Sequence, residues 1–411
     1  MTKVLGLQAE KGRWIFVFLG LVINLCLGAV YSWSIFKKPV EELFSTTATA
    51  SGLPYMFSLA AFALLMPLVG KLLDRYGPRI MTIAGGILVG LGWVLAGFST
   101  NIVFLTIAYA LLAGGGVGVA YGAPLLVSTK WFPDRKGLAV GLTLVGFGLS
   151  ALITAPLAQW LIDLTTPLHT FKILGAGFAI IIILAALPLK LPPRDWKPSG
   201  FKPSAAESKV KELAPGKMLK TGAFWGLWVC YTIGTLAGLM AIGISKPVGQ
   251  EIVMLPPALA AITVSLFAVF NGIGRPIFGW FTNKAAPRIA AITSFILILL
   301  ASLGMLIAGE GTTALYIISF SAFWLCLGGW LAIAPTATAV FFGTKNYARN
   351  YGIMFTAYGA GAILGSLLSG RLRDLLGSYK FVFYPTAALA VVGIVIAIFL
   401  VKPPRIREKN R

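Results

Sequence analysis

The sequence predicts an all-α membrane protein with twelve transmembrane helices, on the strength of three observations. Hydrophobic residues make up 58% of its 411 residues and charged residues only 11%, whereas a soluble domain has about 25% charged residues. The mean hydropathy is +0.87. Twelve apolar segments are long enough to cross the roughly 30 Å hydrocarbon core of a bilayer as helices. They lie at residues 14–36, 52–70, 80–98, 103–129, 136–161, 170–190, 222–245, 255–281, 287–308, 313–342, 350–370 and 379–401.

One long polar stretch separates the sixth of these segments from the seventh. Residues 191–220 are rich in Pro, Ser, Lys and Glu, a composition that cannot bury enough apolar surface to form a core. We therefore divide the chain into a first six-helix bundle (1–190), a cytoplasmic linker (191–220) and a second six-helix bundle (221–411). A short amphipathic helix is expected in the linker near Ala205–Leu213.

The net charge of +21 reflects membrane topology rather than a nucleic-acid partner. The connections between successive predicted helices lie on alternate sides of the membrane. When the basic residues of these connections and of the termini are counted, 26 of the 34 lie on one side and seven on the other. The positive-inside rule then places both termini and the linker in the cytoplasm, as expected for a multi-pass protein of the plasma (inner) membrane. The seven residues assigned to the external side are Lys37, Lys38, Lys172, Lys246, Arg371, Arg373 and Lys380.

Arg275 is the one basic residue that this scheme leaves inside a predicted helix. It lies about six residues, or roughly 9 Å, from the end of its segment at Phe281. A guanidinium group at that depth costs at least about 2.5–3.5 kcal/mol unless it meets a cavity or a partner. Its planar fork matches both oxygens of a carboxylate, so we predict an anion site; bonding to backbone carbonyls is the structural alternative. Asn271 lies one turn earlier on the same helix face.

Other chemistry is not indicated by the sequence. None of the 13 acidic residues lies well inside a predicted helix, and the three cysteines lack the spacing of a zinc site. The single histidine, His169, falls in a predicted external connection. We therefore expect no catalytic residues, no metal and no cofactor, and we do not expect an enzyme. A membrane sensor derived from a transporter remains an alternative.

The two halves of the chain share a motif. Gly70–Ile80 (GKLLDRYGPRI) aligns without gaps to Gly279–Ile289 (GWFTNKAAPRI), and each stretch follows an even-numbered helix on the predicted cytoplasmic side. Parallel six-helix repeats are the layout of a rocking carrier, in which the substrate binds near the midplane between the halves.

Gly70–Ile80 also resembles the signature motif of the major facilitator superfamily, and the twelve segments and central linker extend this resemblance over nearly the whole chain. Four further motifs resemble the branch of oxalate:formate antiporters and monocarboxylate transporters. The resemblance implies the major facilitator fold, a carboxylate held by Arg275, and a cytoplasmic gate latch formed by Asp74, Arg75 and Arg79. The four motifs are YSW (Tyr31–Trp33), WFPDRKGLAVG (Trp131–Gly141), Arg275 with Pro276, and ARNYG (Ala348–Gly352).

The chain departs from the oxalate carrier pattern at several pocket positions. Tyr358 stands where that carrier has a lysine, Phe355 where it has tryptophan, and Phe147 where it has tyrosine; Leu327 and Leu331 replace aromatic residues. A pocket with one cation and more aliphatic lining should prefer a short monocarboxylate, such as lactate or pyruvate, over a dianion.

We therefore expect a monomeric secondary transporter that moves small monocarboxylates by alternating access, coupled to a proton. An organic-anion exchanger of the oxalate:formate type is the alternative. Because Asn271 stands where animal monocarboxylate transporters have Asp, the bound carboxylate itself is left to accept the proton. The expected binding residues are Arg275, Asn271, Tyr31, Tyr121, Phe147, Leu331, Phe355 and Tyr358, the two N-terminal tyrosines serving either as hydroxyl donors or as packing residues.

Overall fold

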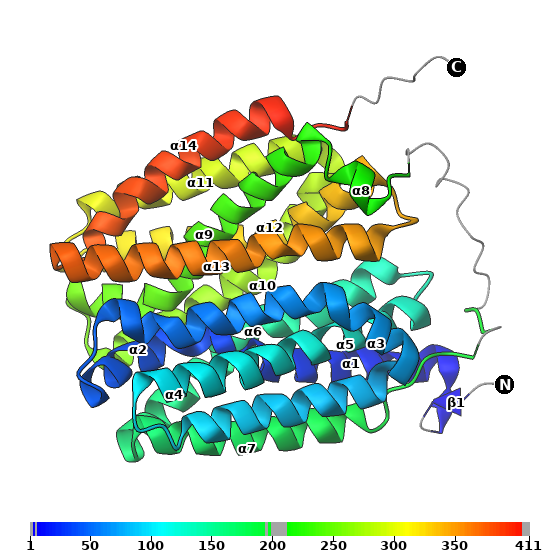
Figure 1. The fold of residues 1–411 in the computed structure, drawn as a ribbon, viewed down its shortest axis with the longest axis horizontal. Helices are drawn as coiled ribbons and strands as arrows, with labels where there is room; N and C mark the ends of the chain where they lie inside the picture. The colour runs from blue at the N-terminus through cyan, green and yellow to red at the C-terminus, as the bar shows by residue number, and fades with distance from the viewer. Residues whose placement is uncertain (1–2, 5, 194–195, 199–211, 405–411) are drawn as a thin grey trace.

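The computed structural model of the protein describes residues 3–4, 6–193, 196–198 and 212–404, and long helices dominate it (Figure 1). The amphipathic helix expected near Ala205–Leu213 falls almost entirely within residues 199–211, outside the described residues.

The first half of the chain begins with a short antiparallel hairpin and continues as helices. A 3-10 turn, η1, interrupts the first transmembrane helix, and a π-helical segment, η2, interrupts the fourth. The elements are β1 (Lys3–Val4), β2 (Leu7–Gln8), α1 (Ala9–Leu27), η1 (Gly28–Ser32), α2 (Trp33–Leu43), α3 (Ala48–Ala96), α4 (Ile102–Ile107), η2 (Ala108–Gly114), α5 (Gly115–Trp131), α6 (Lys136–Leu164) and α7 (Pro167–Ala186).

The second half contains six long helices and two short ones. Glu212 and Leu213, at the end of the predicted linker, already pack on this half: the Glu212 carboxylate accepts hydrogen bonds from the backbone of Thr344 and Lys345. The elements are α8 (Pro215–Met218), α9 (Gly222–Glu251), α10 (Pro257–Ala285), α11 (Pro287–Ile307), α12 (Thr313–Phe342), α13 (Tyr347–Leu376), η4 (Tyr379–Val382) and α14 (Phe383–Leu400).

The described chain has eleven helical segments long and apolar enough to span a membrane, and one of them, α3, covers two of the twelve predicted helices. Gly77 breaks α3 with φ 78° and ψ 168°, and Pro78 follows it. The aligned residue of the second half, Ala286, has φ 75° and ψ 151° and is followed by Pro287. Equivalent turns at equivalent positions confirm the internal repeat, and the twelve predicted helices are all present.

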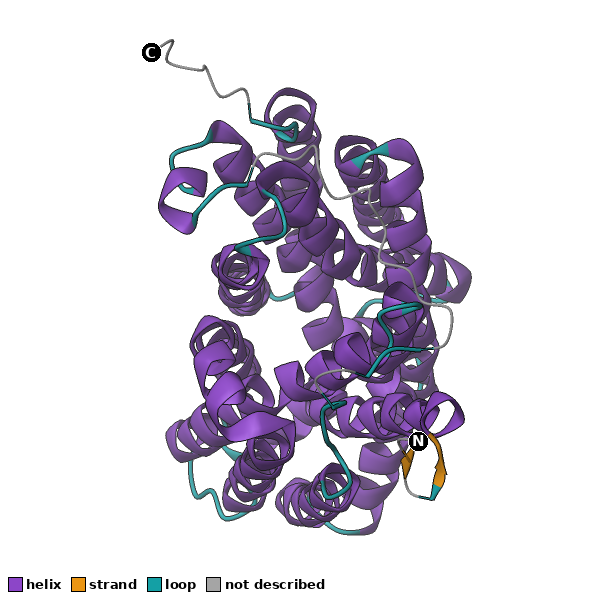
Figure 2. Ribbon diagram, turned by 90° about the vertical axis from the view of Figure 1, so that its right-hand side faces the viewer, coloured by secondary structure: helices purple, strands orange, loops and turns teal. Residues whose placement is uncertain are grey.

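The two halves form separate groups of helices (Figures 1 and 2). Across their interface α3 packs against α13, α6 packs against α10, and α2 packs against α9. Since successive transmembrane helices alternate in direction, the break at Gly77 and the end of α9 lie at opposite ends of the bundle. We call these the Asp74 end and the Glu251 end. The β1–β2 hairpin and α8 lie at one and the same end (Figure 1).

One prediction about the basic residues was wrong. Arg275 is not the only buried cation: the exposed fraction is 2% for Lys37, 4% for Lys246 and 6% for Arg13. Lys37 and Lys246 were assigned to external connections because the apolar runs end before them. In the structure α2 continues to Leu43 and α9 to Glu251, which places both lysines inside helices that pack between the halves.

Candidate functional site

Arg275 lies on α10 at the interface between the halves, with 6% of its surface exposed. Its Nη1 donates a hydrogen bond to the carbonyl oxygen of Leu144 on α6, in the other half. Its Nε and Nη2 have no hydrogen-bond partner, and among the described residues no carboxylate forms an ion pair with it. Leaving buried charged donors unpaired is costly, and the described residues leave these two nitrogens without an acceptor.

A glycine contact explains how Arg275 reaches across the interface. A side chain on Gly148 of α6 would lie 2.9 Å from the Cα atom of Gly272 on α10, closer than side-chain carbon atoms come to their neighbours. The two backbones therefore touch one turn before Arg275. This close approach brings the guanidinium group to the backbone of α6.

Aromatic residues from the first half lie beside the guanidinium group. The Cζ atom of Arg275 lies 5.8 Å from the centre of the Phe147 ring. Tyr31 of η1 and Tyr121 of α5 pack edge-on against Phe147, at 5.1 and 5.5 Å between ring centres. Both tyrosines also lie within electrostatic reach of Arg275. Three of the predicted site residues, Tyr31, Tyr121 and Phe147, thus lie near Arg275.

The second half contributes a stacked aromatic pair from α13. The rings of Phe355 and Tyr358 are stacked with centres 4.9 Å apart, and both residues are buried. The Tyr358 hydroxyl lies 2.8 Å from that of Tyr31. A residue that sequence reasoning missed, Phe62 of α3, touches this pair and also Phe147 and Tyr121. Nothing in the sequence distinguishes Phe62 from the many other phenylalanines of the apolar segments.

Asn271 and Leu331 lie differently from the aromatic residues. Asn271 is completely buried, and its Nδ2 donates to the backbone oxygen of Trp324 at 3.1 Å. Its Oδ1 has no partner, so the side chain is held by α12 with its acceptor free. Leu331 is half-buried on α12, and no described contact joins it to Arg275.

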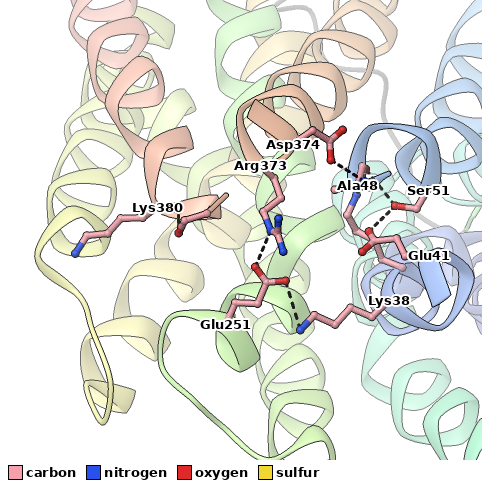
Figure 3. A network of polar contacts seen from close by, with 10 residues as sticks. Lys38, Glu41, Ala48, Ser51, Glu251, Arg373, Asp374 and Lys380 are labelled. Atoms are coloured by element: carbon pink, nitrogen blue, oxygen red, sulfur yellow. Dashed lines mark hydrogen bonds and ion pairs between the residues drawn. The ribbon is translucent and has the colours of Figure 1, made fainter. Parts of the chain in front are cut away.

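Polar bridges close the bundle at the Glu251 end (Figure 3). Glu251 of the second half forms ion pairs with Lys38 of the first half at 3.4 Å and with Arg373 at 2.9 Å. Asp374 accepts hydrogen bonds from the backbone nitrogens of Ala48 and Thr49, at the first turn of α3. Carboxylates are favoured at this position because a helix N-terminus presents free N–H groups and a positive dipole end.

A third bridge at this end joins α6 to α9. Lys246 donates to Oε1 of Gln159 at 2.5 Å, and Gln159 donates in turn to Asp163. Lys246 was expected to be a surface cation of a loop; it is instead a buried interface residue.

The Asp74 end carries fewer links between the halves. Asp74, Arg75 and Arg79 are exposed and, within the part of the chain that the structure describes, form no ion pair. Of the described hydrogen bonds, none joins the halves nearer to this end than that of Arg275 with Leu144, although Gly352 of α13 packs against Pro67 of α3. The conformation is thus closed by polar contacts at the Glu251 end.

The WFPDRKG motif has a structural partner that the sequence did not reveal. Asp134 accepts two hydrogen bonds from Arg13, at 2.6 and 2.8 Å, and so joins the start of α1 to the α5–α6 connection. The Arg13 guanidinium also lies 4.4 Å from the centre of the Phe132 ring. The hydrogen bonds from Arg13 lower the pKa of Asp134 from its ordinary value.

Comparison with known proteins gives one consistent result. A family model described as Major Facilitator Superfamily matches residues 14–341 and 234–411. The oxalate:formate antiporter of Oxalobacter formigenes is 30% identical over 95% of this chain and 91% of its own. Monocarboxylate transporter 13 of Bos taurus is 27% identical over 90% and 84%, respectively.

The fold is likewise found among solved structures. A bacterial homologue of the human lysosomal transporter Spinster, in an inward-facing and unoccupied conformation, superposes with a TM-score of 0.71. The alignment covers 93% of this chain and 95% of that one, at 15% sequence identity.

Proposed function

Because the chain belongs to the major facilitator superfamily, we propose that it is a proton-coupled secondary transporter of small monocarboxylates such as lactate and pyruvate. It is a membrane transporter and not an enzyme, and it is related to oxalate:formate antiporters and monocarboxylate transporters over most of its length.

The observation that carries the proposal is the state of Arg275. Two nitrogens of its buried guanidinium group form no described hydrogen bond, and the group lies in an aromatic cluster at the interface of the halves, with the Tyr121 hydroxyl beside it. A carboxylate fits such a fork with two charge-assisted hydrogen bonds. Among the described residues no second cation contacts this cluster, and a single cation neutralises a single carboxylate.

The alternative is an organic-anion exchanger, and the 30% identity to the oxalate:formate antiporter supports it. A dianion such as oxalate would bring a second negative charge into the aromatic cluster. Tyr358 and Phe355 offer that charge no counter-ion, and burying it unpaired is unfavourable. The single buried cation of the cluster therefore favours a monocarboxylate over a dianion.

The difference between the two ends of the bundle supports transport by alternating access. We place the Glu251 end outside and the Asp74 end in the cytoplasm of a cell whose plasma membrane holds the carrier as a monomer, because basic residues gather at the Asp74 end. The conformation described is then closed to the outside. When the carrier reverses, Asp74, Arg75 and Arg79 would form the cytoplasmic latch and the Glu251 bridges would open.

Uptake by the purified protein in lipid vesicles tests the proposal. We expect labelled lactate and pyruvate to enter faster than formate, acetate or oxalate. Oxalate uptake that requires internal formate, with no lactate uptake, would instead establish the exchanger. No uptake of any of the five anions would refute both assignments.

A further inference from the structure

Tyrosine residues gather on the Asp74 side of Arg275. Tyr347 and Tyr351 of α13 stack with their ring centres 5.8 Å apart and their planes 3° apart, and Tyr351 packs in turn on Phe355 at 5.8 Å. Tyr231 of α9 lies 6.5 Å from the same Phe355 ring. The aromatic cluster around Arg275 therefore continues along α13 toward the Asp74 end.

The positions of these residues along their helices give their order across the membrane. The end of α10 and the starts of α9 and α13 all lie at the Asp74 end. At the helical rise, Arg275 is about 15 Å from that end of α10, and Tyr231 is about 14 Å from that end of α9. Tyr351 is only about 6 Å from the start of α13. An anion that leaves Arg275 in this direction therefore meets Tyr231 and then Tyr351.

Exposure rises in the same direction. Tyr231 is completely buried and Tyr121 is 6% exposed, whereas Tyr351 and Tyr347 are half-buried. The cluster thus connects the buried guanidinium group of Arg275 to the surface at the Asp74 end.

The hydroxyl groups of this cluster lie close to one another. The Tyr231 hydroxyl forms no described hydrogen bond and lies beside that of Tyr351. Tyr121, whose hydroxyl lies beside Arg275, is within electrostatic range of Tyr231 and Tyr351. Burying a hydroxyl group without a partner is costly, and a ligand that accepts a hydrogen bond would remove this cost.

Packing holds the Tyr231 ring in place. The ring stacks on Trp330, with centres 6.0 Å apart and planes 23° apart, and Phe355 lies near it as well. A side chain on Gly234, one turn further along α9, would lie 2.0 Å from Nε1 of Trp330, so Trp330 is pressed against the α9 backbone. The Tyr231 hydroxyl is therefore positioned by ring packing before any ligand arrives, which lowers the entropic cost of binding.

We propose that Tyr231 and Tyr351 form a second binding position for the transported carboxylate, on the Asp74 side of Arg275, from which the substrate is released at the Asp74 end. This inference rests on the proposed function, because it takes the substrate to be a small carboxylate. Neutral hydroxyl donors hold a carboxylate more weakly than a guanidinium group does, and a position on a release path must bind weakly enough to let the substrate leave. Arg275 is within electrostatic range of Tyr231, so the anion keeps its counter-charge nearby as it moves.

Transport measured from each side tests this position in the full-length carrier. Right-side-out and inside-out membrane vesicles present opposite ends of the protein, and the vesicles in which a membrane-impermeant thiol reagent labels Glu310→Cys are those that present the Glu251 end. At equal pH on both sides, Tyr231→Phe and Tyr351→Phe should each raise the KM for lactate supplied at the Asp74 end about fivefold, as for one lost hydrogen bond. The KM for lactate supplied at the Glu251 end should change by less than about twofold, because Arg275 is intact.

Tyr109→Phe is the matched control. Tyr109 is another buried tyrosine whose hydroxyl forms no described hydrogen bond, but it lies in η2 of the first half, packed against Trp33 and Trp93. Phenylalanine keeps the ring in every variant, so Tyr109→Phe should have the KM values of wild type at both ends. If Tyr231→Phe is not recovered in the membrane, Tyr351→Phe decides the test, because its half-buried position tolerates the change.

The outcomes separate this proposal from the proposed function. If wild-type protein transports lactate but neither variant changes the KM at the Asp74 end, the second position is refuted and the carrier assignment stands. Equal rises at both ends would place the hydroxyl groups in the Arg275 site itself, and an equal rise in Tyr109→Phe would show a general packing effect; either result overturns the second position. If wild-type protein transports none of the carboxylates, the proposed function fails and this inference fails with it.

Discussion

The hydroxyl groups of Tyr31 and Tyr358 lie 2.8 Å apart, so that one hydrogen bond joins the two halves beside Arg275. Both residues are completely buried. The pair joins η1 of the first half to α13 of the second, so in the proposed transport cycle it lies next to the substrate. The residue at position 358 should accordingly affect which anions the carrier transports.

The first prediction concerns charge at position 358. Tyr358→Lys adds a second cation beside the aromatic cluster, and we expect the ratio of oxalate to lactate uptake to rise about tenfold or more, as for one added charge-assisted hydrogen bond. Tyr358→Phe removes the hydrogen bond to Tyr31 without adding charge and should leave the ratio nearly unchanged. An unchanged ratio in Tyr358→Lys would contradict the argument that the number of cations selects the anion.

The second prediction concerns Arg275. Arg275→Ala should abolish lactate binding and uptake, while Arg275→Lys should weaken binding about tenfold or more, because a point charge replaces a planar fork. Binding is measured by equilibrium dialysis of the purified protein. Lys284→Ala is the control, since Lys284 is an exposed cation of the same helix. Lactate uptake by Arg275→Ala at a near wild-type rate would show that the substrate binds elsewhere.

The third prediction concerns the closure at the Glu251 end. Glu251→Gln removes the ion pairs to Lys38 and Arg373 together, which should favour the conformation open at this end by about 1–2 kcal/mol, a factor of about 5 to 30. Gly52 lies in α3, where an added Cβ atom would be 3.5 Å from Nζ of Lys37. We expect a membrane-impermeant thiol reagent to label Gly52→Cys faster by the same factor when Glu251→Gln is also present. Glu310→Gln, an exposed carboxylate near the same end, should have no effect.

The same reagent tests the orientation. In whole cells Glu310→Cys should react and Lys345→Cys should not, because the Glu251 end is proposed to face outward. The opposite pattern would reverse the assignment of the two ends.

The Glu251 prediction has its own contrary outcome. If Gly52→Cys is labelled at the same rate with and without Glu251→Gln, Glu251 is not a gate residue.

The fold was predictable because hydropathy and the repeated motif are signals that extend over whole helices. The break after Tyr76 is an example: Gly77 and Pro78 form a turn there, and the aligned residues Ala286 and Pro287 form the equivalent turn in the second half. The Arg275 cluster was predictable in part, because a lone guanidinium group in an apolar helix demands a partner. Lys37 was not. Its charge ends an apolar run, so a hydropathy argument assigns it to a loop, and only the packing of α2 against α9 buries it.

The fourth prediction uses the ion pair of Arg13 with Asp134. A carboxyl group whose pKa falls on folding stabilises the folded state above the pKa of the unfolded chain, about 3.9 for Asp, and the stabilisation is lost as the pH falls through the lower folded-state value. The hydrogen bonds from Arg13 lower the pKa of Asp134. Wild type should therefore have a higher Tm than Asp134→Asn between pH 5 and 8, and the gap should shrink below about pH 4. A gap that does not change with pH would mean that the charge of Asp134 contributes nothing.

The fifth prediction concerns the proton. A monocarboxylate anion entering a cell whose interior is negative is opposed by about 2.3 kcal/mol per 100 mV, and one accompanying proton cancels this term. Arg275 does not release a proton and Asn271 cannot accept one, so in the proposed symport the bound carboxylate carries the proton. An inward pH gradient should then drive lactate uptake, whereas the empty carrier, with Arg275 uncompensated, should reorient slowly. Exchange against internal lactate should therefore be faster than net uptake.

Asn271→Asp completes this test. Asn271 donates to the backbone oxygen of Trp324 at 3.1 Å, and a carboxyl group at this position keeps that bond only when it is protonated. Once ionised it would instead neutralise Arg275, one turn further along α10.

The Asn271→Asp substitution thus gives the empty site both a proton acceptor and a counter-charge, and we expect net uptake to approach the rate of exchange. Asn271→Leu, which like the native Asn supplies neither, should leave net uptake slower than exchange, because the unpaired guanidinium group stays in the empty carrier. Uptake is measured with and without a pH step and with and without internal lactate. If the pH step has no effect in wild type, the protein is an anion exchanger and Asn271→Asp should then leave exchange as the only mode.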